Sequence, residues 1–255
     1  MKIHACVVVP VFNHGEKAAE LALRLAPFGL RTFMVNDGSE ASSRAALHQL
    51  GNRHDWIDIL DHPENRGKGA AVMTGLRAAH AQKYSHALQI DADGQHDPDD
   101  IPQFLALAEN NPTSVIVGCP QFDGTVPKGR LIARYLTHVW VWIETLSFTI
   151  RDSMCGFRVY PLEPVIRIAD QVRLGRRMDF DPEILVRLHW EGLPIISQPT
   201  KVSYPAGGQS YFRLWHDNCL ISWMHTRLVF GMLWRLVSFR FWRARTESRS
   251  TKVLG

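Results

Sequence analysis

Short apolar runs alternate with amphipathic segments through the first half of the chain. Five apolar runs have the length and composition of buried strands, at residues 5–12, 31–36, 57–60, 86–90 and 114–118. Between them, apolar residues recur at helical spacing over residues 16–25, 42–50, 69–82 and 98–107. This alternation predicts an α/β fold with a mixed, mostly parallel sheet flanked by helices.

The pattern changes after about Pro120. Apolar spacing predicts a long helix over residues 131–150, then a short strand over 156–160 and a further strand over 195–204. Another helix is expected to begin at residues 181–183, with Asp181 as its N-cap. Neither a repeat nor a low-complexity linker separates the two halves, so we expect one unit whose second half completes the site.

The last part of the chain is rich in Trp, Phe, Leu and Arg. Arg227, Arg235 and Arg240 interrupt the apolar residues of segment 220–242, so no uncharged run approaches the ~18 residues that span a bilayer. Aromatic rings and guanidinium groups mixed with aliphatic residues are typical of a helix lying in the headgroup region. The alternative is a helix packed on the domain or in a dimer interface.

Charge is distributed unevenly along the 255 residues. The formal net charge is +4, but residues 213–255 carry eight Lys/Arg against two Asp/Glu, which gives +6 and leaves −2 for the rest. Such asymmetry favours an anionic partner surface, either a membrane or a nucleic acid. The segment lacks an obvious nucleic-acid-binding motif, so we expect membrane contact and no nucleic-acid partner.

Cysteine usage and the N-terminus indicate the compartment. The four cysteines show neither CxxC spacing nor paired His ligands, which predicts reduced thiols and no zinc site: Cys6, Cys119, Cys155 and Cys219. The first apolar segment is too short for a signal peptide and is broken by Pro10 and Asn13. We therefore expect a cytoplasmic protein, peripheral on the cytoplasmic face of the membrane.

An acidic cluster follows the fourth predicted strand. Asp91 and Asp93 stand one residue apart, so on an extended strand end their carboxylates point to the same side. Two such carboxylates can share a hard divalent cation, which prefers oxygen ligands and completes its shell with water and substrate phosphates. The alternative is an acidic loop between strand and helix, and for Asp97 we expect that role, as the cap of a helix beginning at Pro98.

Polar residues also follow the other predicted strands. Asn13 comes after the first strand and Asp37 after the second, and ligands of open parallel sheets bind outside the carboxyl ends of the strands. Segment 62–69 carries two glycines and two cations before a helix, which favours an anion, although a solvated basic loop explains it too. Further on, cations that could neutralise a leaving diphosphate or lie on a solvated helix face are Lys128, Arg130 and Arg134.

Six segments taken together resemble family-2 glycosyltransferases of the GT-A fold, especially the dolichyl/polyprenyl-phosphate mannosyltransferase-like branch. They are residues 8–13, 35–39, 65–71, 89–96, 152–160 and 191–195, and the resemblance covers roughly residues 5–210. Each segment is moderately specific, but their order and spacing together are highly specific. The resemblance implies a GT-A domain at 1–212, with a nucleotide-sugar-binding half at 1–118 and an acceptor half at 119–212. Residues 213–255 form the basic aromatic tail.

The resemblance also assigns roles to residues of the donor site. Asp37 contacts the base, Asp91 the ribose or the metal, and Asp93 binds the Mg²⁺ or Mn²⁺ that bridges the donor diphosphate. The remaining metal ligands are Gln95 or His96. Other residues expected along the nucleotide sugar are Pro10, Phe12, Asn13, Gly67, Lys68 and Ala92, with Arg130 and Arg134 on the phosphates.

The acceptor side is less defined. By resemblance Arg158 and Glu183 lie near the acceptor, while the general base stays open among Asp152, Asp179, Asp181 and Glu183. A lipid phosphate acceptor needs no base, because its nucleophile is already ionised. The usual acidic residue after the first-strand Asn is missing, since His14-Gly15 stands there.

The expected function is therefore inverting transfer of a sugar from a nucleotide-diphosphate donor to a lipid or lipid-linked acceptor. One alternative is a nucleotidyltransferase-type enzyme, although those usually carry a Gly-rich, basic turn after the first strand and this chain has Asn-His-Gly-Glu there. Another is a non-enzymatic membrane- or nucleic-acid-binding module, which leaves the acidic strand end unexplained.

Overall fold

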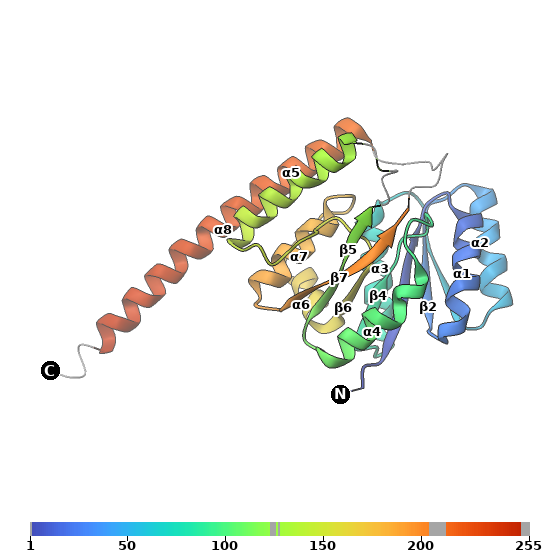
Figure 1. The fold of residues 1–255 in the computed structure, drawn as a ribbon, viewed down its shortest axis with the longest axis horizontal. Helices are drawn as coiled ribbons and strands as arrows, with labels where there is room; N and C mark the ends of the chain where they lie inside the picture. Colours follow the sequence, from blue (N-terminus) through green and yellow to red (C-terminus); the bar gives the residue numbers. More distant parts are fainter. Residues whose placement is uncertain (1, 123–125, 127, 204–212, 251–255) are drawn as a thin grey trace.

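A seven-stranded sheet forms the centre of the molecule (Figure 1). The computed structural model describes residues 2–122, 126, 128–203 and 213–250, with the side chains at 128, 130, 214 and 239–250 excepted. The strands are β1 (Ala5–Val11), β2 (Thr32–Asp37), β3 (Ile57–His62), β4 (His86–Gln89), β5 (Val115–Phe122), β6 (Arg158–Pro161) and β7 (Ile195–Val202). They pair in the order β3-β2-β1-β4-β6-β5-β7, and only β6 runs antiparallel to its neighbours. The predicted mixed, mostly parallel sheet is confirmed.

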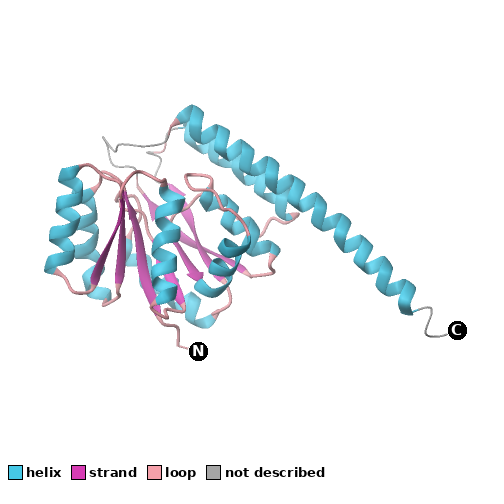
Figure 2. Cartoon of the chain, turned by 180° about the vertical axis from the view of Figure 1, so that it is seen from behind, coloured by secondary structure: helices cyan, strands magenta, loops and turns pink. Residues whose placement is uncertain are grey.

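Helices cover both faces of this sheet (Figure 2). They are α1 (Gly15–Leu25), α2 (Ala41–Arg53), α3 (Lys68–Ala81), α4 (Ile101–Asn110), α5 (Lys128–Thr145), α6 (Leu162–Gln171), α7 (Phe180–Trp190) and α8 (Leu214–Ser250), with single 3-10 turns η1 (Ala26–Phe28) and η2 (Pro98–Asp100). Helices α1, α2 and α4 bury their apolar residues in one core, and α3, α6 and α7 bury theirs in the other.

Alternation along the strands divides the two cores. In β1, Cys6 and Val8 contact the α3 side, whereas Val7, Val9 and Val11 contact the α1 side. Because both faces are covered, every residue of β2 is buried. This explains why the strands appear in the sequence as continuous apolar runs.

Several element boundaries differ from those expected from the sequence. Helix α6 was not predicted, although Leu162, Val165 and Ile166 follow helical spacing; Pro164, tolerated only in a first turn, obscures the pattern. Helix α5 ends at Thr145 instead of 150, and α8 begins at Leu214, before residue 220.

The two predicted helix caps have opposite outcomes. Asp97 does cap the turn that begins at Pro98, because its side chain accepts a hydrogen bond from the Asp99 N–H. Asp181 as an N-cap is wrong: α7 begins at Phe180, so Asp181 lies inside the first turn. Of the predicted strand 195–204, Tyr204 lies outside the described residues.

Helices α5 and α8 lie side by side above the α7 side of the domain, and α8 continues well beyond it (Figure 1). Two buried carboxylates hold α8 in place: Glu183 of α7 binds Arg227, and Glu144 of α5 binds His225 with a distance of 2.7 Å. Over the described residues, no helix combines the length and apolarity needed to cross a membrane.

Candidate functional site

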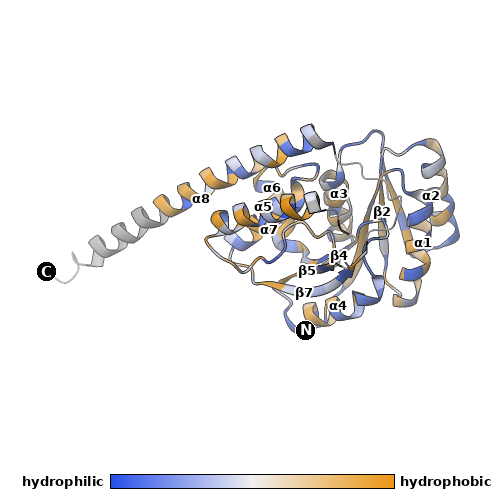
Figure 3. Cartoon of the chain, turned by 45° about the horizontal axis from the view of Figure 1, so that its top comes forward, coloured by the Kyte–Doolittle hydropathy of each residue, from blue (hydrophilic) through white to orange (hydrophobic). Residues whose placement is uncertain are grey.

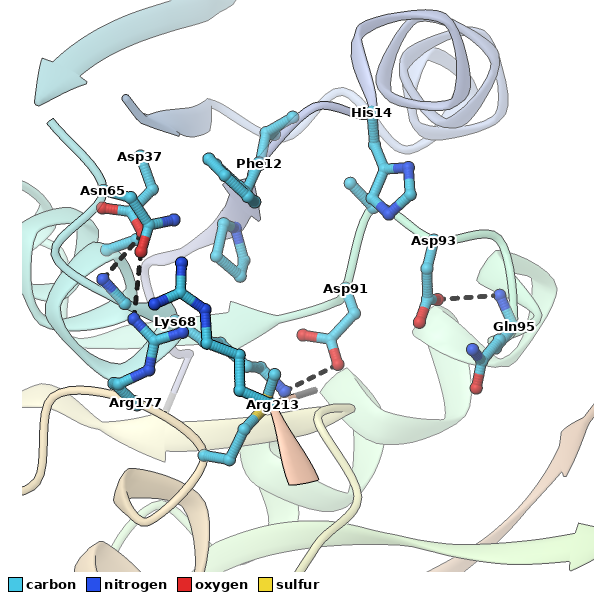
Figure 4. Close-up of a pocket in the computed structure, with 16 residues that line it drawn as sticks. Phe12, His14, Asp37, Asn65, Lys68, Asp91, Asp93, Gln95, Arg177 and Arg213 are labelled. Carbon is cyan, nitrogen blue, oxygen red and sulfur yellow. Dashed lines mark hydrogen bonds and ion pairs between the residues drawn. The ribbon is translucent and has the colours of Figure 1, made fainter. Parts of the chain in front are cut away.

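A cavity opens at the carboxyl ends of β1, β2 and β4, where the sequence placed its polar strand ends (Figure 4). These three strands are neighbours and parallel, so the residues that follow them reach one edge of the sheet. Nine of the predicted site residues line it: Pro10, Phe12, Asp37, Gly67, Lys68, Asp91, Ala92, Asp93 and Gln95. The candidate donor residues of the first half therefore come together in one cavity.

Asp37 forms a fixed acidic wall of this cavity. Its Oδ1 accepts from the Arg66 N–H at 2.9 Å and lies 2.7 Å from His62 Nδ1, while Oδ2 accepts from the Gly67 N–H at 2.8 Å. These contacts tie the end of β2 to the loop before α3. Gly67 adopts φ of +99°, and a Cβ there would lie 2.5 Å from the Arg176 carbonyl oxygen, so only glycine fits.

Lys68 links two carboxylates at the floor of the cavity. Its Nζ lies 2.7 Å from Asp91 Oδ2 and 2.8 Å from Asp181 Oδ2. Burial alone would raise the pKa of Asp91, but the Lys68 ammonium holds it below its usual range. Burial likewise opposes the charge of Lys68, yet Asp181 and Asp91 raise the pKa of the ammonium. A Cβ at Gly156 would lie 2.2 Å from Asp91 Oδ2, so the backbone of the second half packs directly against this carboxylate.

The acidic strand end offers oxygen atoms to a cation. Asp93 Oδ1 accepts from the Gln95 N–H at 3.0 Å and faces the cavity (Figure 4). Among the described residues, Asp91 Oδ1 and His96 Nδ1 are buried without a hydrogen-bond partner. No three His, Cys, Asp or Glu side chains of the described chain converge on one point. The set therefore fits a cation held by one or two carboxylates together with substrate phosphates.

Asn13 and His14 connect the first two strand ends. Asn13 does not line the cavity; its Oδ1 accepts from the Glu40 N–H at 2.8 Å and its own N–H donates to Ser39 Oγ at 3.0 Å. His14, which replaces the acidic residue expected there, lines the cavity beside Asp93 (Figure 4). Burial lowers the pKa of His14, which favours a neutral imidazole near pH 7.

Arg158 is fully buried and lies away from the cavity wall. Its guanidinium donates to the backbone carbonyls of Ser153, Cys155 and Asp181 at 2.6 to 2.8 Å. Through these contacts Arg158 joins the 152–155 loop to the start of α7.

Asp152 and Arg134 pair with each other. Arg134 Nε and Nη2 lie 2.6 and 2.7 Å from the two carboxylate oxygens, and the N–H groups of Met154 and Cys155 donate to Oδ1. Burial would raise the pKa of Asp152, but His138 and Arg134 hold it well below its usual range, and so strongly ionised a carboxylate is a weak base. Neither residue lines the cavity, and the side chains of Lys128 and Arg130 lie outside the described residues.

The carboxylates of α7 have separate surroundings. Glu183 is fully buried and accepts from Arg187, Arg227 and the Gly175 N–H. Asp181 contacts the cavity residue Lys68, and Asp179 Oδ1 accepts from the N–H of the cavity residue Arg177 at 3.0 Å. Asp179 stands at the N-cap position of α7, where its side chain makes no capping hydrogen bond, and burial raises its pKa. Of the four base candidates, Asp179 and Asp181 therefore contact cavity residues.

Seven cavity residues were not among the predicted site residues: Val11, His14, Asn65, Ala71, Arg177, Met178 and Arg213. Arg177 Nε lies 3.0 Å from Asp217 Oδ1 of α8, and its Nη1 donates to Asn65 Oδ1 at 3.1 Å. Asp217, itself fully buried, also accepts from the Arg213 N–H. Arg213, directly before α8, therefore supplies part of the cavity wall, and Asp217 in the first turn of α8 holds Arg177 across 40 residues, a link that no local pattern reveals.

A family model described as "Glycosyl transferase family 2" matches residues 6–163, which include β1 to β6 and most of the cavity. The chain belongs to glycosyl transferase family 2. The resemblance inferred from the sequence is thereby confirmed.

Relatives within this family are distant. The dolichyl-phosphate beta-glucosyltransferase ALG5C of Trichomonas vaginalis is 26% identical over 204 residues, which cover 72% of this chain and 59% of that protein. The UDP-N-acetylglucosamine--dolichyl-phosphate N-acetylglucosaminyltransferase of Methanococcus voltae is 22% identical over 214 residues, covering 78% of this chain and 85% of that protein.

A solved structure supports the fold. Glucosyl-3-phosphoglycerate synthase from Mycobacterium tuberculosis, in complex with Mn²⁺ and UDP-glucose, superposes with a TM-score of 0.64 at 14% identity. The match covers 91% of this chain and 79% of that chain. This family-2 glycosyltransferase thus has the expected GT-A-like fold.

Proposed function

We propose that this family-2 glycosyltransferase moves a sugar, with inversion, from a nucleotide-diphosphate donor to a lipid or lipid-linked phosphate acceptor. The observation that carries the proposal is the single cavity in which Asp37, Lys68, Asp91 and Asp93 meet at the carboxyl ends of parallel strands. Relatives named for dolichyl phosphate support the class of acceptor. The nucleotidyltransferase and non-enzymatic alternatives have no comparable support.

The donor would lie along the edge of the sheet. Pro10 and Phe12 would contact the nucleoside, and Asp37, held rigidly by three hydrogen bonds, would accept from the base. Lys68 and Arg213 would approach the diphosphate, where cations neutralise the charge that develops on the leaving group.

A divalent cation, Mg²⁺ or Mn²⁺, fits the acidic strand end. Asp93 would hold it, with the unpartnered Oδ1 of Asp91 and the side chain of Gln95 as further ligands, whereas His96 does not line the cavity. When bound, such a cation stabilises the charge of the departing diphosphate. The named complex of the glucosyl-3-phosphoglycerate synthase with Mn²⁺ supports this class of cofactor.

A phosphate acceptor agrees with the positions of the second-half carboxylates. Asp152 and Glu183 are engaged by arginines and lie away from the cavity, and Asp181 is engaged by Lys68. An acceptor phosphate is already ionised at neutral pH, so its attack on the sugar requires positioning more than proton removal. The protein would then contribute alignment and charge neutralisation.

Thermal stabilisation by donors tests the proposal. A tight ligand of the folded state raises the apparent stability by mass action, by ~2.7 kcal/mol at a hundredfold excess over Kd. We expect one nucleotide sugar of a panel of UDP- and GDP-sugars to raise the melting temperature, and to do so more strongly with Mn²⁺ than with chelator. A uniform absence of stabilisation across the panel would contradict donor binding.

We further propose that α8, together with α5, lies on the cytoplasmic face of the membrane. With the exception of Leu23, the exposed large apolar side chains of the described residues belong to α5, the loop after it, or α8. On α8, Trp223, Phe230 and Trp234 follow spacings of seven and four residues and share one face. Figure 3 shows apolar residues along both helices. Such faces, beside a basic segment, suit the headgroup region of an anionic bilayer.

Vesicle binding tests this contact. Replacing Trp223, Phe230 and Trp234 with serine removes three exposed aromatic groups, and we expect flotation with phosphatidylglycerol-containing vesicles to weaken at least about tenfold. Leu23→Ser is the matched control, because Leu23 is 68% exposed on another helix. If flotation of the triple variant is unchanged, and light scattering shows that the variant is a monomer where the unmodified protein is a dimer, the face instead contacts a second copy of the chain.

A further inference from the structure

A second cavity lies beside the donor cavity and shares two loops with it, the loop before α3 and the loop that follows α6. It is bounded by the end of β3, the first turns of α3, the end of α6 and the loop that follows α6. Its wall carries a single acidic residue, Glu64, and four arginines. The arginines are Arg66, Arg77, Arg173 and Arg176. This cavity is not part of the donor site described above.

Three of these arginines carry uncompensated charge. Arg77 pairs with Asp170 at 2.7 Å. Within the described residues, the guanidinium groups of Arg66, Arg173 and Arg176 form neither an ion pair nor a hydrogen bond, and Glu64 has no cationic partner. Like charges gathered around one cavity repel each other, and a multiply charged anion relieves that repulsion.

The backbone that carries these arginines is held in place. The Ala70 N–H donates to the Arg176 carbonyl oxygen at 2.9 Å, and the Gly175 N–H donates to Glu183 at 2.8 Å. On the opposite side, the Arg66 N–H is bound to Asp37. The two loops therefore keep a fixed separation, and the arginines are brought together by the fold.

The first turn of α3 completes the cavity. Gly69 and Ala70 of this turn line it, and Thr74 Oγ1 and His62 Nε2, which also lie in its wall, form a hydrogen bond with each other at 2.9 Å. A helix N-terminus carries partial positive charge, which adds to that of the arginines. Guanidinium groups bind phosphate oxygens in pairs, so the chemistry of the wall matches phosphate.

We propose that this second cavity is a binding site for a multiply charged, phosphate-bearing anion, held by Arg66, Arg173 and Arg176. The site is separate from the donor cavity and does not depend on the proposed transfer reaction. The lining also includes Met73, Val172 and Leu174, which offer apolar surface to a small apolar part of the same ligand.

Calorimetric titration of the full chain with inorganic pyrophosphate tests the site. The buffer contains chelator and low salt, so that metal-assisted binding in the donor cavity is suppressed. We expect saturable binding that the double variant Arg173→Ser/Arg176→Ser weakens at least tenfold. Hydrogen bonds to charged groups are stronger than those between neutral groups, so the loss of two guanidinium groups is expected to exceed that factor.

Two controls make the result specific. Arg53→Ser/Arg151→Ser removes the same charge from exposed arginines elsewhere and should leave the affinity within about twofold. Arg213→Ser, in the donor cavity, should also leave it unchanged. Circular dichroism establishes that each variant is folded. Three results would overturn the proposal: an equal loss of pyrophosphate affinity in the control pair, a loss in the Arg213 variant alone, or full binding by the Arg173/Arg176 variant.

Phosphate of this kind occurs both in soluble compounds and in lipid headgroups, and flotation separates these two sources. Vesicles containing phosphatidic acid present a phosphate monoester at a surface. If the double variant floats as the unmodified protein does, the ligand is soluble; if flotation falls with pyrophosphate affinity, it is a lipid headgroup. Either result retains the site.

Discussion

Asp93→Ala is expected to lower sugar transfer by at least about 10²–10³-fold while leaving the fold intact. Asp93 faces the donor cavity, and within the described residues its side chain accepts one hydrogen bond, from the nearby Gln95 N–H. Its loss therefore removes the principal cation ligand without exposing a buried partner. Preorganised groups that stabilise developing charge are worth about this factor in rate.

A neighbouring carboxylate provides the control for this variant. Asp99 is exposed, lies outside the cavity lining and forms an ion pair with Arg24. Asp99→Ala changes the net charge equally and should retain transfer within about twofold. Initial rates at saturating donor, with thermal unfolding of both variants, provide the comparison. Full activity of Asp93→Ala in the presence of chelator would contradict the assigned role.

Lys68→Met is expected to destabilise the folded protein by about 3–5 kcal/mol at neutral pH, because it leaves two buried carboxylates without their shared cation. Asp91 and Asp181 both lie within 2.8 Å of Lys68 Nζ, and their side chains are largely or almost wholly buried. Urea unfolding measures the change, with exposed Lys2→Met as the control. A loss below 1 kcal/mol would contradict the structural role of the bridge.

The same variant has a pH dependence with a definite sign. In the unmodified protein the pKa of Asp91 is depressed, so its contribution to stability is present above the unfolded-state pKa of about 4 and is lost as pH falls through the folded value. Without Lys68, burial raises this pKa instead. The stability difference between the two proteins should therefore be largest near pH 7 and shrink as pH falls, first through the raised value in the variant and then through the depressed value in the unmodified protein.

The donor half of the site was predictable because it depends on local order. Parallel strands that alternate with helices bring their carboxyl ends to one edge, where Asp37 is the last residue of β2 and Asp91 and Asp93 follow shortly after β4. Sequence position alone therefore placed them in one cavity. The helix-capping role of Asp97 followed equally from the residue that succeeds it, Pro98.

The second half was less predictable because its contacts are long-range. Arg177 lines the cavity and is held by an ion pair with Asp217 of α8. Nothing in the local sequence before α7 indicates that role. Arg158 matches the family motif in sequence, but its burial follows from the place of β6 between β4 and β5. Whether Asp152 is a base or the partner of Arg134 is likewise decided by a contact across 18 residues. Tertiary packing fixes these roles.

Product analysis of the transfer reaction tests the central claim most directly. The full chain is incubated with the nucleotide sugar that stabilises it, Mn²⁺ and vesicles containing a polyprenyl phosphate, and the lipid product is examined by mass spectrometry and NMR. We predict a sugar-phosphate lipid whose anomeric configuration is opposite to that of the donor, with no product in chelator or with Asp93→Ala. Metal-independent transfer, retention of configuration, or release of pyrophosphate from a nucleoside triphosphate would contradict it.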